Sequence, residues 1–177
     1  MAVRRGTLAD IPQVVSIYDH VLMEEESGRT AIGWIRGVYP TERTALESLN
    51  AGTLFVLERE GTIAAAAKID QNQVTEYVNA HWEVPDAPPE RVMVLHTLVV
   101  DPPLAGKGCG TEFVRFYERY ALENGCPYLR MDTNARNTAA RRLYARLGYR
   151  EAGIVPCVFN GIPDVQLVCL EKVLKIP

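Results

Sequence analysis

The chain has 177 residues, a net charge of −3 at neutral pH, and the apolar (47%) and charged (23%) fractions of an ordinary globular protein. This length predicts one domain, residues 1–177, with a single sizeable core, and the mildly acidic charge argues against nucleic acid as a partner. No apolar run is long enough to span a bilayer and the first residues lack the apolar stretch of a signal peptide, so we expect a cytoplasmic protein with no membrane partner.

The cysteines also limit the possible functions. The sequence contains four, which form no C-x-x-C pair and show no spacing typical of metal ligands. We therefore expect reduced thiols, as in the cytoplasm, and no metal site.

The first helix has a clear start and an unusual end. Thr7 and Asp10 have the spacing of a capping box, and apolar residues recur at helical spacing from Ile11 to Leu22. The helix ends near Ser27-Gly28, after Glu24–Glu26, so three carboxylates lie beside the negative end of the helix dipole. We interpret them as a solvated helix end, and the alternative is an acidic patch that attracts a cationic substrate.

The remaining elements follow from periodicity and turn residues. The pattern at 74–82 allows either a strand or a loop, and Asn160-Gly161 marks a hairpin whose loop we expect to reach Pro163. The element order predicts an α/β (α+β mixed sheet) fold, with a central mixed sheet of about six to seven strands flanked by about four helices. The predicted strands are Val3–Arg5, Leu54–Glu58, Thr62–Ile69, Val92–Val100, Tyr128–Asp132, Glu151–Phe159 and Val165–Leu170; the later helices are Thr41–Leu49, Thr111–Asn124 and Thr138–Leu147, with a loop or broken helix at Arg29–Tyr39.

Residues 95–110 combine a strand, a glycine-rich turn and a helix start. The β-branched apolar run stops at Asp101, and glycines follow at Gly106, Gly108 and Gly110. Glycines let backbone N–H groups approach a ligand closely, and a helix N-terminus supplies about half a positive charge. This stretch is therefore a candidate phosphate-binding site.

Two motifs make the second half of the chain resemble the GNAT N-acetyltransferase superfamily. A-G-K-G-C-G, from Ala105 to Gly110, is similar to that family's acyl-CoA signature R/Q-x-x-G-x-G/A, with Ala105 in place of the leading Arg or Gln. The second signature, N-x-x-A-x-x-L-Y-x-x-x-G-F/Y, is complete, and one predicted helix and one strand separate the two motifs, as in the family. The resemblance implies a GNAT-like acyl-CoA N-acyltransferase fold and direct transfer of an acetyl group from acetyl-CoA to a primary amine of a small molecule or peptide. The residues of the second signature are Asn137, Ala140, Leu143, Tyr144, Gly148 and Tyr149.

The resemblance also implies where acetyl-CoA binds as co-substrate. Its pyrophosphate would meet backbone N–H groups of the glycine turn, and its pantetheine arm would pair with the 98–100 backbone. Asn137 and Tyr144 are two helical turns, roughly 10 Å, apart on one face, along which the arm would lie. Basic residues near the turn are candidates for the phosphates or, alternatively, a solvated helix face: Lys107, Arg136, Arg141, Arg142 and Arg146. The implied cofactor-binding residues are Leu98, Val99, Val100, Ala105, Gly106, Lys107, Gly108, Cys109, Gly110, Thr111, Asn137 and Tyr144.

Two side chains are candidates for proton transfer. Tyr144 matches the family's tyrosine near the thioester sulfur, and a phenol with a pKa of about 10 is protonated at neutral pH and can donate to a leaving thiolate. His96 lies on the central strand where several family members have a base, and an imidazole pKa near 6.5 suits that role, whereas a packed strand histidine is the alternative. The resemblance implies a backbone N–H near Val99 as the oxyanion donor. Weaker candidates for the base are Glu24–Glu26, Glu76, His81 and a chain of water molecules.

Other interpretations of the glycine turn fit less well. A dinucleotide-binding oxidoreductase needs G-x-G-x-x-G, and here the third glycine is mis-spaced and little chain remains for a second domain. A nucleophilic Cys109 at the helix start is disfavoured because the family forms no covalent enzyme intermediate. A non-catalytic acyl-CoA-binding sensor or interaction module on the same fold stays open, and product formation with any amine would discriminate.

The sequence leaves the acceptor open. Its pocket should come from residues 24–39, 74–89 and 156–164, where Trp34, Tyr77, Trp82 and several acids suit a small amine with an aromatic or cationic part. Ordinary loop packing is the alternative interpretation of these residues. A peptide N-terminus, an amino acid, a polyamine and an aminoglycoside are all compatible with these residues. Many family members dimerise, so a homodimer is a further candidate partner.

Overall fold

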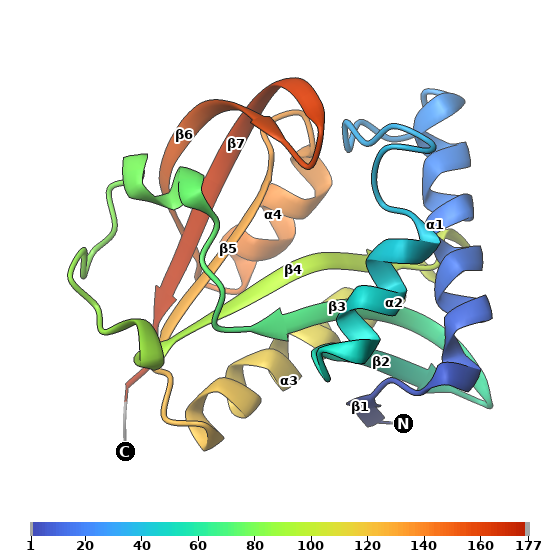
Figure 1. The fold of residues 1–177 in the computed structure, drawn as a ribbon, viewed down its shortest axis with the longest axis horizontal. Helices are drawn as coiled ribbons and strands as arrows, with labels where there is room; N and C mark the ends of the chain where they lie inside the picture. The colour runs from blue at the N-terminus through green and yellow to red at the C-terminus, as the bar shows by residue number, and fades with distance from the viewer. Residues whose placement is uncertain (1, 176–177) are drawn as a thin grey trace.

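The structure, a computed structural model, describes residues 2–175 and is built on a seven-stranded sheet (Figure 1). The strand order is β1-β2-β3-β4-β5-β7-β6, and all neighbours are antiparallel except β4 and β5, which are parallel. This mixed sheet with its flanking helices confirms the predicted fold class. The strands are β1 (Ala2–Arg5), β2 (Leu54–Arg59), β3 (Thr62–Asp70), β4 (Val92–Val100), β5 (Tyr128–Asn134), β6 (Arg150–Phe159) and β7 (Ile162–Val173), and the α-helices of this region are α1 (Ile11–Glu26), α2 (Glu42–Asn50), α3 (Cys109–Glu123) and α4 (Thr138–Arg146).

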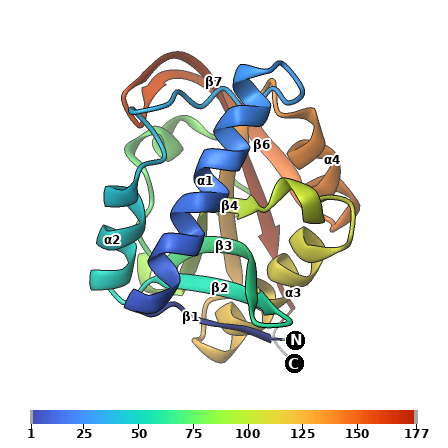
Figure 2. The same cartoon turned by 90° about the vertical axis from the view of Figure 1, so that its right-hand side faces the viewer.

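Helices cover both faces of the sheet, with α1 and α2 on one side and α3 and α4 on the other (Figure 2). Strand side chains alternate between the faces, so Leu54 and Val56 of β2 pack with α1 and α2, whereas Phe55 and Leu57 pack with α3. The four consecutive alanines of β3, Ala64–Ala67, are all buried. Their small side chains let the helices approach the middle of the sheet.

The chain-order predictions are confirmed except at a few boundaries. The capping box at Thr7 and Asp10 is present, and α3 begins at Cys109, two residues before the prediction, because Gly108 is a left-handed N-cap with φ +85°. The expected long loop after β6 is wrong. Phe159 pairs with Ile162, so a two-residue turn joins β6 to β7, and both turn residues have positive φ, as type I′ turns require.

The parallel strands β4 and β5 separate partway along their length. Their pairing runs from Val92↔Tyr128 to Leu95↔Met131, after which β4 continues to Val100 and β5 to Asn134 without pairing to each other. The second half of β4 therefore has one backbone edge that no strand of the described region covers. This opening in the sheet positions the site.

A bulge at the opening redirects the β4 side chains. Between β3 and β4 the register passes from Ala66↔Val99 to Lys68↔His96, which places one extra residue on β4. Thr97 lies within this bulge and has φ +53°, a strained backbone conformation for a β-branched residue. The bulge lies where the β4 side chains line the pocket described next.

Candidate active site

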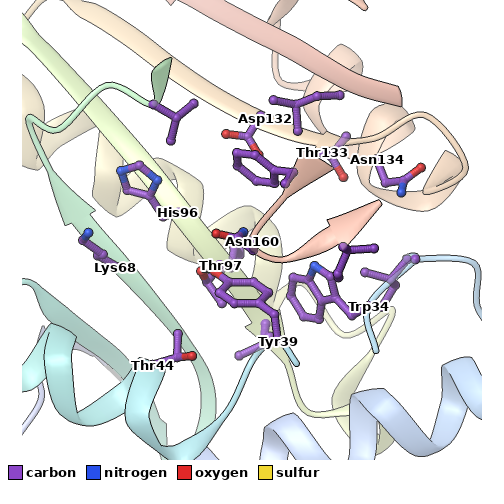
Figure 3. Close-up of a pocket in the computed structure, with 18 of the residues that line it drawn as sticks. Trp34, Tyr39, Thr44, Lys68, His96, Thr97, Asp132, Thr133, Asn134 and Asn160 are labelled. Carbon is purple, nitrogen blue, oxygen red and sulfur yellow. Dashed lines mark hydrogen bonds between the residues drawn. The ribbon is translucent and has the colours of Figure 1, made fainter. Parts of the chain in front are cut away.

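A pocket of about 820 Å³ lies in the opening between β4 and β5. Figure 3 shows its walls: Asp132, Thr133 and Asn134 follow one another along β5, and His96 and Lys68 come from β4 and β3 on the opposite side. Segment 29–41 and the β6–β7 turn border the remaining side. Of the residues implied by the family motifs, the pocket brings together His96, Leu98, Val99, Val100, Asn137 and Tyr144.

The glycine turn does not line this pocket; it lies where α3 begins. The amides of Leu104, Ala105 and Lys107 bond to backbone carbonyls of the preceding turn. For the amides of Gly106 and Gly108, and for the first amides of α3, no side-chain or turn partner is found within residues 2–175. A Cβ at either glycine would meet nothing within 4 Å. Free amides around open space at a helix N-terminus fit a pyrophosphate.

Gly110 has a different role from the other two glycines of the turn. A Cβ at Gly110 would lie 3.1 Å from a methyl carbon of Leu143 and 3.8 Å from one of Val100. Glycine at this position therefore allows α3 to pack closely against α4 and β4. Cys109 is 1% exposed and belongs to the core, which supports a packing role.

Arg59, at the end of β2, holds the glycine turn in place. The sequence did not indicate this contact. Its guanidinium donates to the Lys107 carbonyl oxygen at 3.3 Å and to the Glu112 carboxylate at 2.9 Å. Ala105 is exposed and presents only a methyl group where the resemblance implies Arg or Gln. Arg141 is not free for a phosphate, because it pairs with Glu151 at 2.7 Å.

Asn137 and Tyr144 both lie on α4 and line the pocket. Asn137 is the N-cap of α4, because its Oδ1 accepts from the Ala140 amide at 3.1 Å. Tyr144 is buried, and no hydrogen-bond partner of its hydroxyl lies among residues 2–175. Burial and the nearby Asp132 raise the Tyr144 pKa, so the phenol stays protonated at neutral pH.

His96 belongs to an ion-pair cluster. Its Nε2 lies 3.0 Å from Asp70 Oδ1, and Lys68 Nζ lies 3.0 Å from Asp70 Oδ2. Burial would raise the pKa of Asp70, but the hydrogen bonds and positive charges of His96 and Lys68 outweigh it and lower that pKa. Asp70 is therefore charged, and its contact with Nε2 orients the His96 ring.

Asp132 is a pocket carboxylate that sequence reasoning did not assign to this site. It accepts a hydrogen bond of 2.7 Å from the hydroxyl of Tyr77, on the 3₁₀ helix Thr75–Asn79. Burial raises the pKa of Asp132 to about 6, against smaller opposing contributions from Tyr77 and His96. Asp70 and Asp132 thus face one pocket with pKa values shifted in opposite directions.

The weaker candidates for the base have other partners or positions. Glu24 pairs with Arg29 and Glu26 with Arg36. Glu25 accepts hydrogen bonds from the backbone amides of Ile32 and Gly33. These carboxylates therefore hold segment 29–41 in addition to forming a solvated helix end. His81 is exposed outside the pocket.

Of the three aromatic residues predicted for the acceptor region, only one lines the pocket. Trp34 lines the pocket. Tyr77 lies behind the wall and donates a hydrogen bond to the pocket residue Asp132. Trp82 lies outside the pocket, with the Arg130 guanidinium 4.3 Å from the centroid of its ring. Of the three expected segments, 24–39 and 156–164 border the pocket and 74–89 contributes only Val74, whereas most of the lining comes from α2, β3, β4, β5 and α4.

Within residues 2–175, no group of three His, Cys, Asp or Glu side chains could hold a metal ion. None of the helices in this part of the chain combines the length and the apolarity that crossing a membrane requires.

Comparison with known proteins decides the family. Residues 17–149 match the model of the acetyltransferase (GNAT) family. The chain belongs to this family. A curated relative, an uncharacterized N-acetyltransferase of Methanocaldococcus jannaschii, is 30% identical over 77 residues, which cover 43% of this chain and 49% of the relative. The chain thus matches about half the length of that relative.

Solved structures share the fold at low identity. An acetyltransferase of the GNAT family from Streptococcus agalactiae has a TM-score of 0.78 at 19% identity, covering 99% of this chain and 96% of that one. The yncA protein of Salmonella typhimurium, solved with its cofactor acetyl-CoA, has a TM-score of 0.71 at 17% identity, covering 98% and 94%. A ribosomal-protein-alanine N-acetyltransferase from Brucella melitensis has a TM-score of 0.72 at 19% identity, covering 98% and 100%.

Proposed function

We propose that the protein transfers the acetyl group of acetyl-CoA to a primary amine of a small molecule or peptide. The observation that carries this proposal is the opening between β4 and β5. It places a free backbone edge of β4, the Tyr144 phenol and a mixed cluster of titratable groups around one pocket. The open glycine turn lies beyond the end of the same strand.

The cofactor would be bound mainly by main-chain groups. The amides from Gly106 to Thr111 would hold the pyrophosphate, and the free edge of Leu98–Val100 would pair with the pantetheine arm, with Asn137 alongside. A backbone cradle does not depend on the side chain at position 105. Arg59 would compensate in part for Ala105 by fixing the turn from outside.

The chemistry requires the loss of two protons from the acceptor nitrogen and the gain of one proton by the leaving sulfur. Acetyl-CoA supplies the thioester whose acetyl carbon bonds to the amine nitrogen as the carbon–sulfur bond breaks. His96 would take a proton from the acceptor ammonium, with Asp70 stabilising the resulting charge. Tyr144 would donate its proton to the leaving sulfur and recover one, through solvent, from the nitrogen that forms the amide. A backbone N–H near Val99 would stabilise the charge on the carbonyl oxygen.

Asp132 is a second candidate for the proton acceptor. The supporting observation is that it lines the same pocket and has a pKa of about 6, which suits exchange near neutral pH. The two assignments differ in their signature, because removing the true base abolishes the low-pH limb of the kcat profile, whereas removing the other residue leaves that limb in place.

A thiol-release assay tests the proposed function. Purified protein, acetyl-CoA and a panel of primary amines should give free thiol and acetylated amine in equal amounts. Acetyl-CoA binding without turnover of any amine would favour the acyl-CoA-binding sensor instead. Homodimer formation stays a prediction, which light scattering on the eluting protein would check.

A further inference from the structure

Segment 29–41 is held over the acceptor end of the pocket. The Glu25 carboxylate accepts from the amides of Ile32 at 2.6 Å and Gly33 at 3.0 Å. At the other end of the segment, the Tyr39 hydroxyl shares a hydrogen bond with Thr97 Oγ1 at the β4 bulge. Two attachments of this kind fix both ends of the segment relative to the sheet.

The same segment touches the opposite wall of the opening. A Cβ at Gly33 would lie 2.4 Å from Asn134 Nδ2, and a Cβ at Gly161 would lie 3.3 Å from Val38 Cγ1. Both glycines have positive φ, +83° and +77°, so they serve the conformation as well as the close approach. Segment 29–41 and the β6–β7 turn therefore meet above the pocket, and we refer to the two together as the roof (Figures 1 and 3).

The space beneath the roof is apolar on one side and charged on the other. Trp34, Tyr39 and Phe159 supply aromatic surface, and the Trp34 and Tyr39 rings are packed edge to face at 5.7 Å. His96 and Asp132 face the same space from β4 and β5. A primary ammonium is complementary to Asp132, and an apolar or aromatic body is complementary to the ring surfaces.

We infer that the acceptor is a compact small-molecule primary amine with an apolar or aromatic body, enclosed by the roof, and not a polypeptide N-terminus. This inference rests on the proposed function and narrows its acceptor class. A peptide adds roughly 3.3–3.6 Å of extended chain per residue, which needs an open groove. The Gly33–Asn134 and Gly161–Val38 contacts close the pocket beneath segment 29–41, so an extended chain cannot leave on that side.

A competition between acceptors tests the inference directly. The probes are 2-phenylethylamine and L-phenylalanine as compact amines, and tetra-alanine amide as a peptide with a free N-terminus. With the full chain and saturating acetyl-CoA, we expect kcat/KM for the better compact amine to exceed that for the peptide by at least about tenfold. Equal or greater kcat/KM for the peptide would overturn the inference while leaving the proposed function standing.

A matched pair of variants locates the selectivity in the roof. Val38→Ala removes two methyl groups where the segment meets the β6–β7 turn, and Val173→Ala makes the same change at a similarly exposed valine on the far end of β7. Val38→Ala should raise the peptide-to-amine ratio of kcat/KM by about tenfold, and Val173→Ala should leave it within about twofold. An unchanged ratio in Val38→Ala would contradict the roof as the selective element. Absence of thiol release with every amine would overturn the proposed function itself.

Discussion

The side of the opening that we propose for the cofactor (the cofactor side) and the side that we propose for the acceptor (the acceptor side) are built from different kinds of group. The cofactor side consists of main-chain groups: glycine-turn amides, the free edge of β4 and a helix N-terminus. The acceptor side consists of side chains from segments far apart in the chain, such as Trp34, Lys68, His96 and Asp132. A backbone site leaves a compact motif in the sequence, whereas a side-chain site does not, so substrate choice can change while the cofactor site is kept.

The two pocket carboxylates repeat this contrast on a smaller scale. Asp70 has Lys68 and His96 as charged partners, which hold its pKa below the ordinary value. Burial raises the pKa of Asp132 to about 6, and the hydrogen bond from the neutral Tyr77 hydroxyl opposes that rise only in part. Titratable groups whose pKa values are shifted apart in one pocket are typical of acid–base sites.

The largest expected effect comes from the proposed acid. Tyr144→Phe should lower kcat by about 100-fold, since a proton donor in the transition state contributes at least that much, while the Kd for acetyl-CoA stays within about twofold. Steady-state kinetics and calorimetric titration of both proteins provide the measurement.

The matched control for this change is Tyr149→Phe. Tyr149 is also buried, and its ring packs against the ring of Tyr144. Its hydroxyl has no hydrogen-bond partner within residues 2–175. Its loss should leave kcat nearly unchanged. Equal losses in the two variants would mean that Tyr144 acts through packing.

The proposed base should give a somewhat smaller effect. His96→Gln should lower kcat by about 30-fold at neutral pH and remove the low-pH limb of the kcat profile, because glutamine cannot accept the proton. If the limb persists with the same apparent pKa, Asp132 replaces His96 as the proton acceptor.

Asp132→Asn should stabilise the fold in a pH-dependent way. Because the pKa of Asp132 rises from 3.8 to about 6 on folding, the folded protein holds a proton that the unfolded chain has lost between these pH values. The wild type therefore loses stability as the pH rises through this window. The variant should be more stable by about 3 kcal/mol near pH 8 and nearly equally stable near pH 4. Urea unfolding at both pH values measures the difference, and a variant less stable near pH 8 would contradict this account.

The smallest effect concerns the glycine turn. Gly108→Ala should raise the acetyl-CoA Kd by about tenfold, or 1.4 kcal/mol, because an L-residue resists φ +85° and displaces the first amides of α3. Gly125→Ala is the control: that glycine, at the other end of α3, has φ +73° and equally open surroundings. It should cost similar stability and leave acetyl-CoA binding unchanged. Similar weakening by both would point to stability and not to the cradle.

Local signals predicted most of the fold and the positions of the motif residues that we propose to bind the cofactor. Periodicity, the Thr7 capping box and the glycine stops gave the order of elements, and the α4 motif placed Asn137 and Tyr144 on one wall. The two-residue turn at Asn160-Gly161 was missed because Pro163 suggested a longer loop, although the chain accommodates Pro163 within β7.

The acceptor half depended on long-range contacts that no local pattern contains. Tyr77 and Asp132 are 55 positions apart, and His96 and Asp70 are 26 apart, so neither pair has a spacing signature. The bulge at Thr97 likewise requires a positive φ at a β-branched residue, against its intrinsic preference. Tertiary packing determines these features.

Calorimetric titration of the full chain with acetyl-CoA, with NAD as the comparison ligand, tests the central claim most directly. The backbone cradle predicts one site with a micromolar Kd for acetyl-CoA and no heat of binding for NAD, in spite of Ala105. A folded protein that does not bind acetyl-CoA would contradict the account and would identify the missing Arg or Gln side chain as essential.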